Sequence, residues 1–264
     1  MNDSVRKQRA SEAFQRLIGI MDDLRAKCPW DREQTFESIR PLTIEETYEL
    51  SEGILEKDYN LIRKELGDLL LHIVFYSKIA EEDNRFDIVD VINSLCDKLI
   101  YRHPHIYGNV KVNDASEVVE NWEQLKIKEK DGNKTVLSGV PTALPALIKA
   151  NRIQEKVRAV GFDWDERSQV WDKVQEELNE LRHEVEVTKS TDDIEKEFGD
   201  LLFSVVNAAR LYGVDPETAL ERTNRKFMKR FTYLEQQTIQ MGRSLKDMTL
   251  DEMNEIWEEA KRFD

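Results

Sequence analysis

Two short acidic stretches in the second half of the chain, EELNE at residues 176–180 and EFGD at residues 197–200, decide how it folds. The first half repeats the same acids at the same spacing, in EETYE at residues 45–49 and ELGD at residues 65–68. An EExxE stretch is therefore followed by an ExxD stretch twice. This duplication predicts two related units in tandem.

Each ExxD stretch leads directly into a mostly apolar segment, residues 69–76 in the first half and 201–209 in the second. A helix that is apolar around most of its circumference has to be covered on several sides, as at the centre of a bundle. Charged residues make up 35% of the chain, and only 10 Gly and 6 Pro interrupt it, which favours helices over a turn-rich sheet protein. We therefore expect an all-α protein with two tandem four-helix-bundle domains.

The periodicity of apolar residues predicts where the helices lie. In the first half it predicts helices at residues 8–27, from near Thr35 or Leu42 to about residue 56, and at 60–82, 86–100 and 117–130. In the second half it predicts helices that contain residues 148–157, 174–185, 197–209, 214–231 and 245–263. Between the first two helices we expect a loop at residues 28–31, because Pro29 disfavours helical geometry in the residue before it. Residues 131–145 contain two Gly and two Pro without periodicity. We expect the domains to span residues 1–135 and 136–264.

Charge and composition argue against several classes of protein. The formal net charge of −14 opposes binding to nucleic acid, which rests on Lys and Arg that neutralise phosphates. The amino terminus is polar, and no run of about 18 apolar residues predicts a membrane span. We expect a cytoplasmic protein with no membrane partner. Cys28 and Cys96 lack a CxxC spacing and are expected to be free thiols.

The duplicated acids are expected to converge. Residues three apart on a helix lie about 60° apart around its axis and share a face. Two antiparallel helices would bring two such pairs together, and four carboxylates at about 5 Å repel one another by roughly 3 kcal/mol per pair. In a chain with 53 acidic residues EExxE is most often a solvated face, but the apolar helices and the duplication favour a cation site. The candidate ligands are Glu177, Glu180, Glu197 and Asp200, and in the first repeat Glu46, Glu49, Glu65 and Asp68.

Ligand sets made only of oxygen select a hard divalent ion, Mg²⁺ first and Mn²⁺ as a possible substitute. An oxidative di-iron bundle is the competing interpretation, and it requires two Glu-x-x-His motifs. One such motif exists at Glu180 and His183, but the first repeat has Glu52 at the position of His183. The sequence therefore favours Mg²⁺, an ion that commonly accompanies a phosphate substrate.

Cationic and aromatic residues follow the acids in both repeats. Lys226 and Arg230 lie four apart on one predicted helix, as do Lys98 and Arg102 in the first repeat, and these pairs are candidate phosphate ligands. A basic surface patch is the alternative. Two loop tryptophans, Trp164 and Trp30, are candidates for stacking on a base, although a lone loop tryptophan is equally often a cap on a core.

Several further stretches, taken together with the acids, resemble the MazG family of nucleoside triphosphate pyrophosphohydrolases, which has the all-α NTP pyrophosphatase fold. The resemblance covers nearly the whole chain, and it is the order and duplication of the motifs that make it specific. The motifs are CPWDREQT at 28–35, TIEETYEL at 43–50, KELGDLLLHIVF at 64–75, YRHPHIYG at 101–108, VGFDW at 160–164, EKEFGDLLFSVVN at 195–207 and NRKFMKRF at 224–231.

The resemblance implies hydrolysis of an NTP or dNTP at the α-phosphorus, which yields the monophosphate and pyrophosphate. It implies that the four acids of the second repeat bind Mg²⁺, that Lys226 and Arg230 contact phosphates, and that Trp164 contacts the nucleoside. Asn224 also fits the family motif, although it lies about 200° around the helix from Lys226. Members of the family typically form dimers, so a homodimer is expected.

The two repeats differ in ways that favour the second as the catalytic one. The first has Cys96 where the second has Asn224, and its cationic helix meets Pro104 early. The resemblance also implies that the second repeat is catalytic, with Glu177, Glu180, Lys226 and Arg230 as the catalytic residues. The general base is either Glu180 or Glu176, whose side chain points about 100° away from that of Glu177. A phosphatase that releases orthophosphate and a non-catalytic nucleotide-binding module remain as alternatives.

Overall fold

The computed structural model describes residues 2–112, 114, 117–118, 121–122, 125–126, 135–164, 166–187 and 190–263. The regular elements in these residues are helices, so the expected all-α class is confirmed. The chain divides into two compact units, residues 1–111 and 112–264. The helix expected at 117–130 falls largely outside the described residues. The predicted domain boundary at 135/136 lies beside residues 127–134, which the structure does not describe. This boundary stays a prediction.

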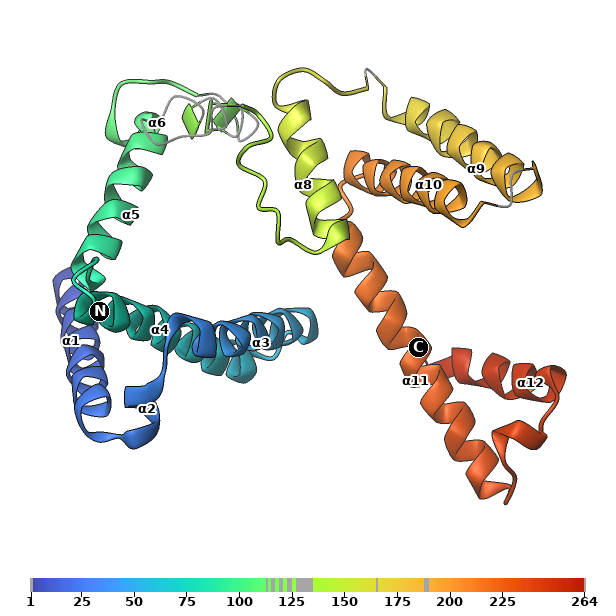
Figure 1. Ribbon diagram of the computed structural model, residues 1–264, viewed down its shortest axis with the longest axis horizontal. Coiled ribbons are helices and arrows are strands. Elements are labelled where there is room, and N and C mark those ends of the chain that lie inside the picture. Colours follow the sequence, from blue (N-terminus) through green and yellow to red (C-terminus); the bar gives the residue numbers. More distant parts are fainter. Residues whose placement is uncertain are drawn as a thin grey trace. The chain divides into compact units, whose positions relative to one another are not determined.

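The first unit is a series of helices in the order drawn from blue to green in Figure 1. Two of them, α3 and α4, form an antiparallel pair that lies side by side along its length and holds the first set of acids. The elements are α1 (Asp3–Lys27), α2 (Pro29–Glu33), α3 (Phe36–Glu56), α4 (Tyr59–Glu82), α5 (Ile88–Arg102) and α6 (Pro104–Tyr107).

Local chemistry explains why α3 and α4 begin and end where they do. Thr35 caps α3 in a capping box, in which its hydroxyl accepts from the Ser38 amide and the Ser38 hydroxyl accepts from the Thr35 amide. Lys57 turns the chain in the left-handed conformation at φ 58°, and the Asp58 carboxylate then accepts from the first amides of α4. This short connection fixes the two helices as antiparallel neighbours.

The core of the first unit lies between α1, α3 and α4. Its fully buried members are Met21, Ile39, Val74, Phe75 and Ile79. The segment at 69–76 thus does supply core residues, as expected. The core is one-sided, however, because Leu70 and Ile73 of the same segment are 40% and 47% exposed.

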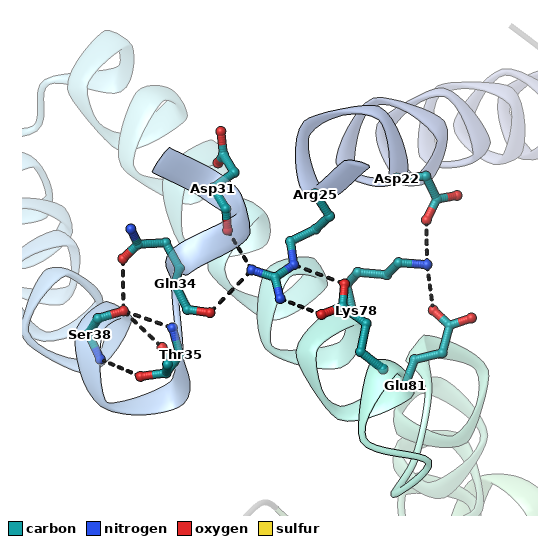
Figure 2. A network of polar contacts seen from close by, with 9 residues as sticks. Asp22, Arg25, Asp31, Gln34, Thr35, Ser38, Lys78 and Glu81 are labelled. Carbon is teal, nitrogen blue, oxygen red and sulfur yellow. Dashed lines mark hydrogen bonds and ion pairs between the residues drawn. The ribbon is translucent and has the colours of Figure 1, made fainter. Parts of the chain in front are cut away.

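A polar network beside this core ties α2 to α1 and α4 (Figure 2). The nearly buried Arg25 guanidinium donates to the backbone carbonyls of Asp31 and Gln34 and pairs with Glu82 at the end of α4. Residues 29–33 are therefore helical rather than the expected loop. Pro29 does stop α1, but it is also well suited to the first position of the next helix, where its missing N–H costs nothing.

The second unit repeats the antiparallel pair and adds a carboxyl-terminal extension. Its pair is α9 and α10, which carry the second set of acids. The elements are α8 (Ala146–Arg158), η1 (Arg167–Gln169), α9 (Val170–Val187), α10 (Thr191–Leu211), α11 (Pro216–Gln240), η2 (Leu245–Asp247), α12 (Leu250–Ala260) and η3 (Lys261–Phe263).

The predicted final helix is present as α12, flanked by the short turns η2 and η3. It packs against α11 through a small core of Leu234, Met248 and Ile256. A capping box between Thr249 and Glu252 begins the helix. The expectation of a docking helix at the end of the chain is confirmed.

An apolar stripe on each acid-bearing helix remains uncovered. Glu65 and Glu197 are equivalent in the repeats, and the next positions match one for one. The exposed fractions are 53% for Leu66, 40% for Leu70 and 47% for Ile73 on α4, and 51% for Phe198, 57% for Leu202 and 45% for Val205 on α10. The full covering expected for these helices is thus not provided by the described residues of their own unit. No helix among those residues is long and apolar enough to cross a membrane.

Candidate functional site

The second set of acids converges between α9 and α10. Glu177, Glu197 and Asp200 each place a carboxylate oxygen within 4.8 Å of the other two. Glu177 is buried, Glu197 is half-buried and Asp200 is exposed, so the cluster forms a shallow site that opens to solvent. Three of the four predicted ligands are thereby brought together from two helices.

Glu180, the fourth predicted ligand, is exposed and lies outside this tight group. Its charge nevertheless acts on the group. Desolvation raises the pKa of Glu197, and the charges of Glu180, Asp200 and Glu177 raise it further. Glu180 is therefore near enough for its charge to act on Glu197, although it does not join the three clustered acids.

A lysine that the sequence analysis did not single out borders this cluster. Lys173 Nζ lies 2.7 Å from Glu177 Oε1 and 3.0 Å from Glu176 Oε1. These two carboxylates raise the pKa of Lys173, with Glu177 having the larger effect. Glu176 is exposed and faces Lys173 instead of joining the three clustered acids, consistent with the separation from Glu177 expected on the helix.

The first set of acids converges between α3 and α4. Glu46, Glu49 and Glu65 place carboxylate oxygens within 4.8 Å of one another. Glu65 is completely buried, and its Oε2 has no hydrogen-bond partner. Burial, the contact with Glu65 and the charges of Asp68 and Glu49 together raise the pKa of Glu46 to about 7. Burial and the neighbouring acids thus favour the protonated form of Glu46.

Lys64 is the second basic residue that sequence reasoning missed. Its Nζ lies 2.7 Å from Glu65 Oε1, 3.6 Å from Glu49 Oε2 and 3.7 Å from Asp68 Oδ2. The ion pair with Lys64 lowers the pKa of Glu65 although burial opposes this. The i,i+4 spacing of Lys64 and Asp68 was the available sequence signal.

The residues present fit a divalent cation in both clusters. A buried carboxylate with an unpartnered oxygen, as at Glu65, requires a compensating positive charge. Every clustered donor is a carboxylate oxygen, the ligand type of hard ions such as Mg²⁺. In the described part of the chain no histidine joins either group, and His183 is exposed, so the geometry gives no support to the di-iron interpretation.

The predicted phosphate ligands of the second repeat lie on α11. Lys226 and Asn224 are exposed, whereas Arg230 is half-buried and stacks its guanidinium 5.7 Å from the ring centre of Trp257 on α12. Trp257 was not singled out from the sequence. Arg230 also borders an open hollow of about 310 Å³ between α11 and η3, together with Lys229, Tyr233 and Phe263. The equivalent residues of the first repeat lie on α5, where Lys98 is exposed and Arg102 half-buried.

The two loop tryptophans are each held by a buried arginine. Trp164 is 40% exposed and follows Asp163. The Arg210 guanidinium on α10 donates to both carboxylate oxygens of Asp163, from Nη2 to Oδ1 at 2.5 Å and from Nη1 to Oδ2 at 3.0 Å. Trp30, 56% exposed, lies in α2, which Arg25 fastens as described above. Neither tryptophan is buried enough to be a core cap, and both present a ring to solvent.

Fold and site together define a class of protein: an all-α chain with two tandem helix pairs, each of which supports a cluster of carboxylates suited to a cation. The chain matches the MazG family, described as the MazG nucleotide pyrophosphohydrolase domain, over residues 34–107 and again over 167–233. It belongs to this family. The two matched ranges contain the two acid clusters, which confirms the tandem organisation and the family resemblance.

Curated relatives extend the similarity over nearly the whole chain. A protein of Thermotoga maritima, named nucleoside triphosphate pyrophosphohydrolase/pyrophosphatase MazG, is 43% identical over 254 residues, which cover 95% of this chain and 96% of that protein. The nucleoside triphosphate pyrophosphohydrolase of Escherichia coli K12 is 42% identical over 253 residues, 94% of this chain and 96% of the relative. The uncharacterized protein YabN of Bacillus subtilis is 43% identical over 251 residues, 94% of this chain but 51% of YabN.

Proposed function

We propose that this chain is a nucleoside triphosphate pyrophosphohydrolase, which hydrolyses NTPs or dNTPs at the α-phosphorus to a monophosphate and pyrophosphate. Two tandem family matches and relatives of that name at 42–43% identity over most of the chain support this activity. The observation that carries the proposal is the convergence of Glu177, Glu197 and Asp200 between two antiparallel helices.

The second cluster is the proposed main site, with Mg²⁺ as its ion and Mn²⁺ as a substitute. Glu177, Glu197 and Asp200 would hold the ion, with Glu180 beside them. The ion supplies charge neutralisation of the phosphates and lowers the pKa of a bound water. Because cation and triphosphate are both needed at one place, a cluster that opens to solvent suits this role better than a closed cage would.

Side chains of the chain itself complete the proposed reaction. Glu180 is exposed at the edge of the cluster, where its carboxylate can accept the proton of the water that attacks the α-phosphorus. Glu176 is the weaker candidate for this base because Lys173 holds its carboxylate at 3.0 Å. Lys226 and Arg230 bind the departing pyrophosphate, and Trp257 fixes the plane of the Arg230 guanidinium. Trp164 stacks on the nucleoside, and Asn224 is a further polar contact.

The first cluster is proposed as a second cation site with lower activity. Glu46, Glu49, Glu65 and Asp68 would hold its ion, Lys98 and Arg102 would bind phosphate, and Trp30 would contact the base. Its acids are more deeply buried than those of the second cluster, with Glu65 fully enclosed. That burial favours a structural role for the cation bound at the first cluster.

A homodimer is part of the proposal. The matched stripes of Leu66, Leu70 and Ile73 on α4 and of Phe198, Leu202 and Val205 on α10 have no covering helix among the described residues of their own unit. Each stripe follows the i, i+4, i+7 spacing of a helix-packing face. Such faces bind another helix, and a second copy of the chain offers the same face by symmetry.

The proposed activity is tested by incubating the protein with each NTP and Mg²⁺ and resolving the products by ³¹P NMR. We expect pyrophosphate and the monophosphate. Orthophosphate together with a diphosphate would identify a phosphatase instead, and binding without turnover a nucleotide-binding module. The Glu180→Gln variant should abolish Mg²⁺-dependent release of pyrophosphate, whereas the matched Glu49→Gln variant of the first repeat should retain much of it. The opposite ranking would contradict the choice of the second repeat.

A further inference from the structure

Each acid cluster contains a lysine of its own, but the two lysines are placed differently. In the first cluster, Lys64 comes from α4, the same helix as Glu65 and Asp68. In the second, Lys173 comes from α9, one turn before Glu177. The second repeat has Lys196 at the position of Lys64, but Lys196 pairs with Asp193 at 2.7 Å, and the first repeat has Leu61 in place of that aspartate. The duplication therefore preserved the acids and this lysine without preserving the contacts of the lysine.

Lys64 contacts most of the acids in the first cluster. Its Nζ lies within 4.0 Å of carboxylate oxygens of Glu49, Glu65 and Asp68, at 3.6, 2.7 and 3.7 Å. One ammonium group thus contacts three of the four acids, including the completely buried Glu65. A divalent cation bound by these acids would need the same oxygens.

Lys173 contacts fewer of the acids in the second cluster. It contacts Glu177 at 2.7 Å, and its other partner is Glu176, which lies outside the group of clustered acids. Across the described residues, no ion pair joins Lys173 to Glu197 or Asp200. Two of the three clustered carboxylates therefore keep their charge uncompensated by this lysine.

We infer that Lys64 is a built-in competitor for the divalent cation at the first cluster, so that cation fills the second cluster at lower concentration than the first. The inference rests on the proposed role of the two clusters as cation sites. Cation binding at the first cluster must displace the Lys64 ammonium from three carboxylates. The Lys64 side chain is 61% exposed, so it can swing into water without any repacking of the core.

The competition sets an order of filling and gives the two repeats different tasks. At low cation concentration the second cluster is loaded while Lys64 holds the first together by ion pairs. The first cluster, with Glu65 buried and one Glu65 oxygen unpartnered, is compensated either by Lys64 or by the cation, and by only one of them at a time. Lys64 thereby keeps the first unit stable without metal.

The test measures Mn²⁺ binding in the full-length chain, by the electron paramagnetic resonance signal of free Mn²⁺. The second cluster is disabled by Glu197→Gln with Asp200→Asn, which leaves the first cluster as the site observed. In this background Lys64→Met should bind Mn²⁺ about tenfold more tightly, because an ammonium group no longer competes at ion-pair distance. Lys64→Arg should restore weak binding.

Arg63→Met is the matched control. Arg63 is the neighbouring residue on α4, is exposed, and has no ion pair in the described part of the chain. Its removal changes the net charge equally, so its effect on the Mn²⁺ dissociation constant should stay within about twofold at 0.15 M salt, where exposed charges are screened. An equal tightening in Arg63→Met and Lys64→Met, or none in Lys64→Met, would overturn the competition.

A second readout is the stability of the first unit, which does not depend on a binding assay. In EDTA, Lys64→Met should destabilise the first unit, and hydrogen exchange of α4 measures this loss. Saturating Mn²⁺ should restore the stability. Lys64→Gln provides the same comparison if Lys64→Met does not fold. Failure of both clusters to bind Mn²⁺ in the unmodified chain would contradict the proposed function, whereas binding that ignores Lys64 contradicts this inference alone.

Discussion

At the scale of single residues, Arg210 shows how much one side chain can hold in place. Only 7% of its side chain is exposed, and its guanidinium contacts both carboxylate oxygens of Asp163 and the Asn207 side chain. Burial of Asp163 would raise its pKa, but the Arg210 contact and the Trp164 backbone amide hold the pKa below its ordinary value. The pair thus fastens the Trp164 loop to α10.

Removal of this arginine should cost far more than removal of its exposed neighbour. We expect Arg210→Met to lower the free energy of unfolding by about 3 kcal/mol, because it removes the buried partner of the largely buried Asp163 carboxylate. Arg158 also approaches Asp163, at 3.6 Å, but is 66% exposed, so Arg158→Met should change stability by about 0.5 kcal/mol or less. Urea unfolding followed by tryptophan fluorescence measures both variants. Equal losses would show that Asp163 does not depend on the buried partner.

The clustered acids were predictable because two helical spacings, repeated twice, define them. Glu177, Glu197 and Asp200 converge as the i,i+3 pattern implies. Lys64, Lys173 and Trp257 were not predictable in the same way. A lysine carries little signal in a chain with 39 basic residues, and the contact of Trp257 with Arg230 requires the packing of α12 on α11. Whether the predicted residues bind substrate stays a prediction.

At the scale of elements, the start of α3 is a point that the sequence left open. The apolar pattern allows a start near Thr35 or near Leu42, on either side of Pro41. The helix begins at the earlier point, after Thr35. The capping box of Thr35 and Ser38 satisfies the backbone amides of both residues, which outweighs the one hydrogen bond lost at Pro41. Likewise α2 was not predicted, and a loop was expected in its place. Pro29 is compatible with the end of one helix as well as with the start of another.

The Thr35 cap should therefore be worth more than an equivalent hydroxyl inside the same helix. Thr35→Ala should destabilise the first turn of α3 by about 1 kcal/mol, because the Ser38 amide loses its side-chain acceptor. Thr47→Ala is the control, since the Thr47 hydroxyl only donates to the Thr43 carbonyl within the helix and alanine favours helix there. Hydrogen exchange of peptides that cover residues 36–40 measures the difference. Faster exchange in Thr47→Ala than in Thr35→Ala would contradict the role of the cap.

The start of α12 should respond to acid through Glu252. The Arg243 ion pair and the Thr249 cap lower the pKa of Glu252 to about 2. A lowered folded-state pKa means that the contribution to stability is fully present above the ordinary value of about 4.5 and is lost as pH falls toward 2. We expect protection of the α12 amides to decline across this range.

Glu252→Gln separates this group from the other carboxylates of the chain. Glutamine can still accept from the Thr249 amide but has no charge for Arg243, so the acid dependence of α12 protection between pH 4.5 and 2 should flatten in this variant. Hydrogen exchange at several pH values, with α10 peptides as an internal reference, measures this. An unchanged pH profile in Glu252→Gln would assign the acid response to other groups.

At the scale of the whole molecule, the tandem architecture could be predicted because the duplicated motifs are long and ordered. The two compact units and the two family matches agree with it. The expected complete burial of the acid-bearing helices was not met by the described residues of either unit taken by itself. Periodicity shows that a helix face is apolar, but it does not show whether the same chain or another one covers that face.

The uncovered stripes lead to a prediction about assembly. In the proposed homodimer Leu202, 57% exposed on α10, lies at an apolar interface. Leu202→Glu should weaken association by about 3 kcal/mol or more, roughly a hundredfold in the dissociation constant, because a charge would be buried against an apolar face. Two-fold symmetry places the substitution twice in each interface. Sedimentation equilibrium should then show a dimer for the unmodified protein and a monomer for the variant at micromolar concentration.

Ile239→Glu is the control for added charge. Ile239 is 73% exposed on α11 and belongs to neither stripe, so its substitution should leave the dimer intact. Leu70→Glu tests the matching position on α4 and should weaken the dimer if the first repeat contributes its own contact. A monomeric unmodified protein would contradict the homodimer. Dissociation by Ile239→Glu alone would move the interface to α11 and would leave the stripes without a partner.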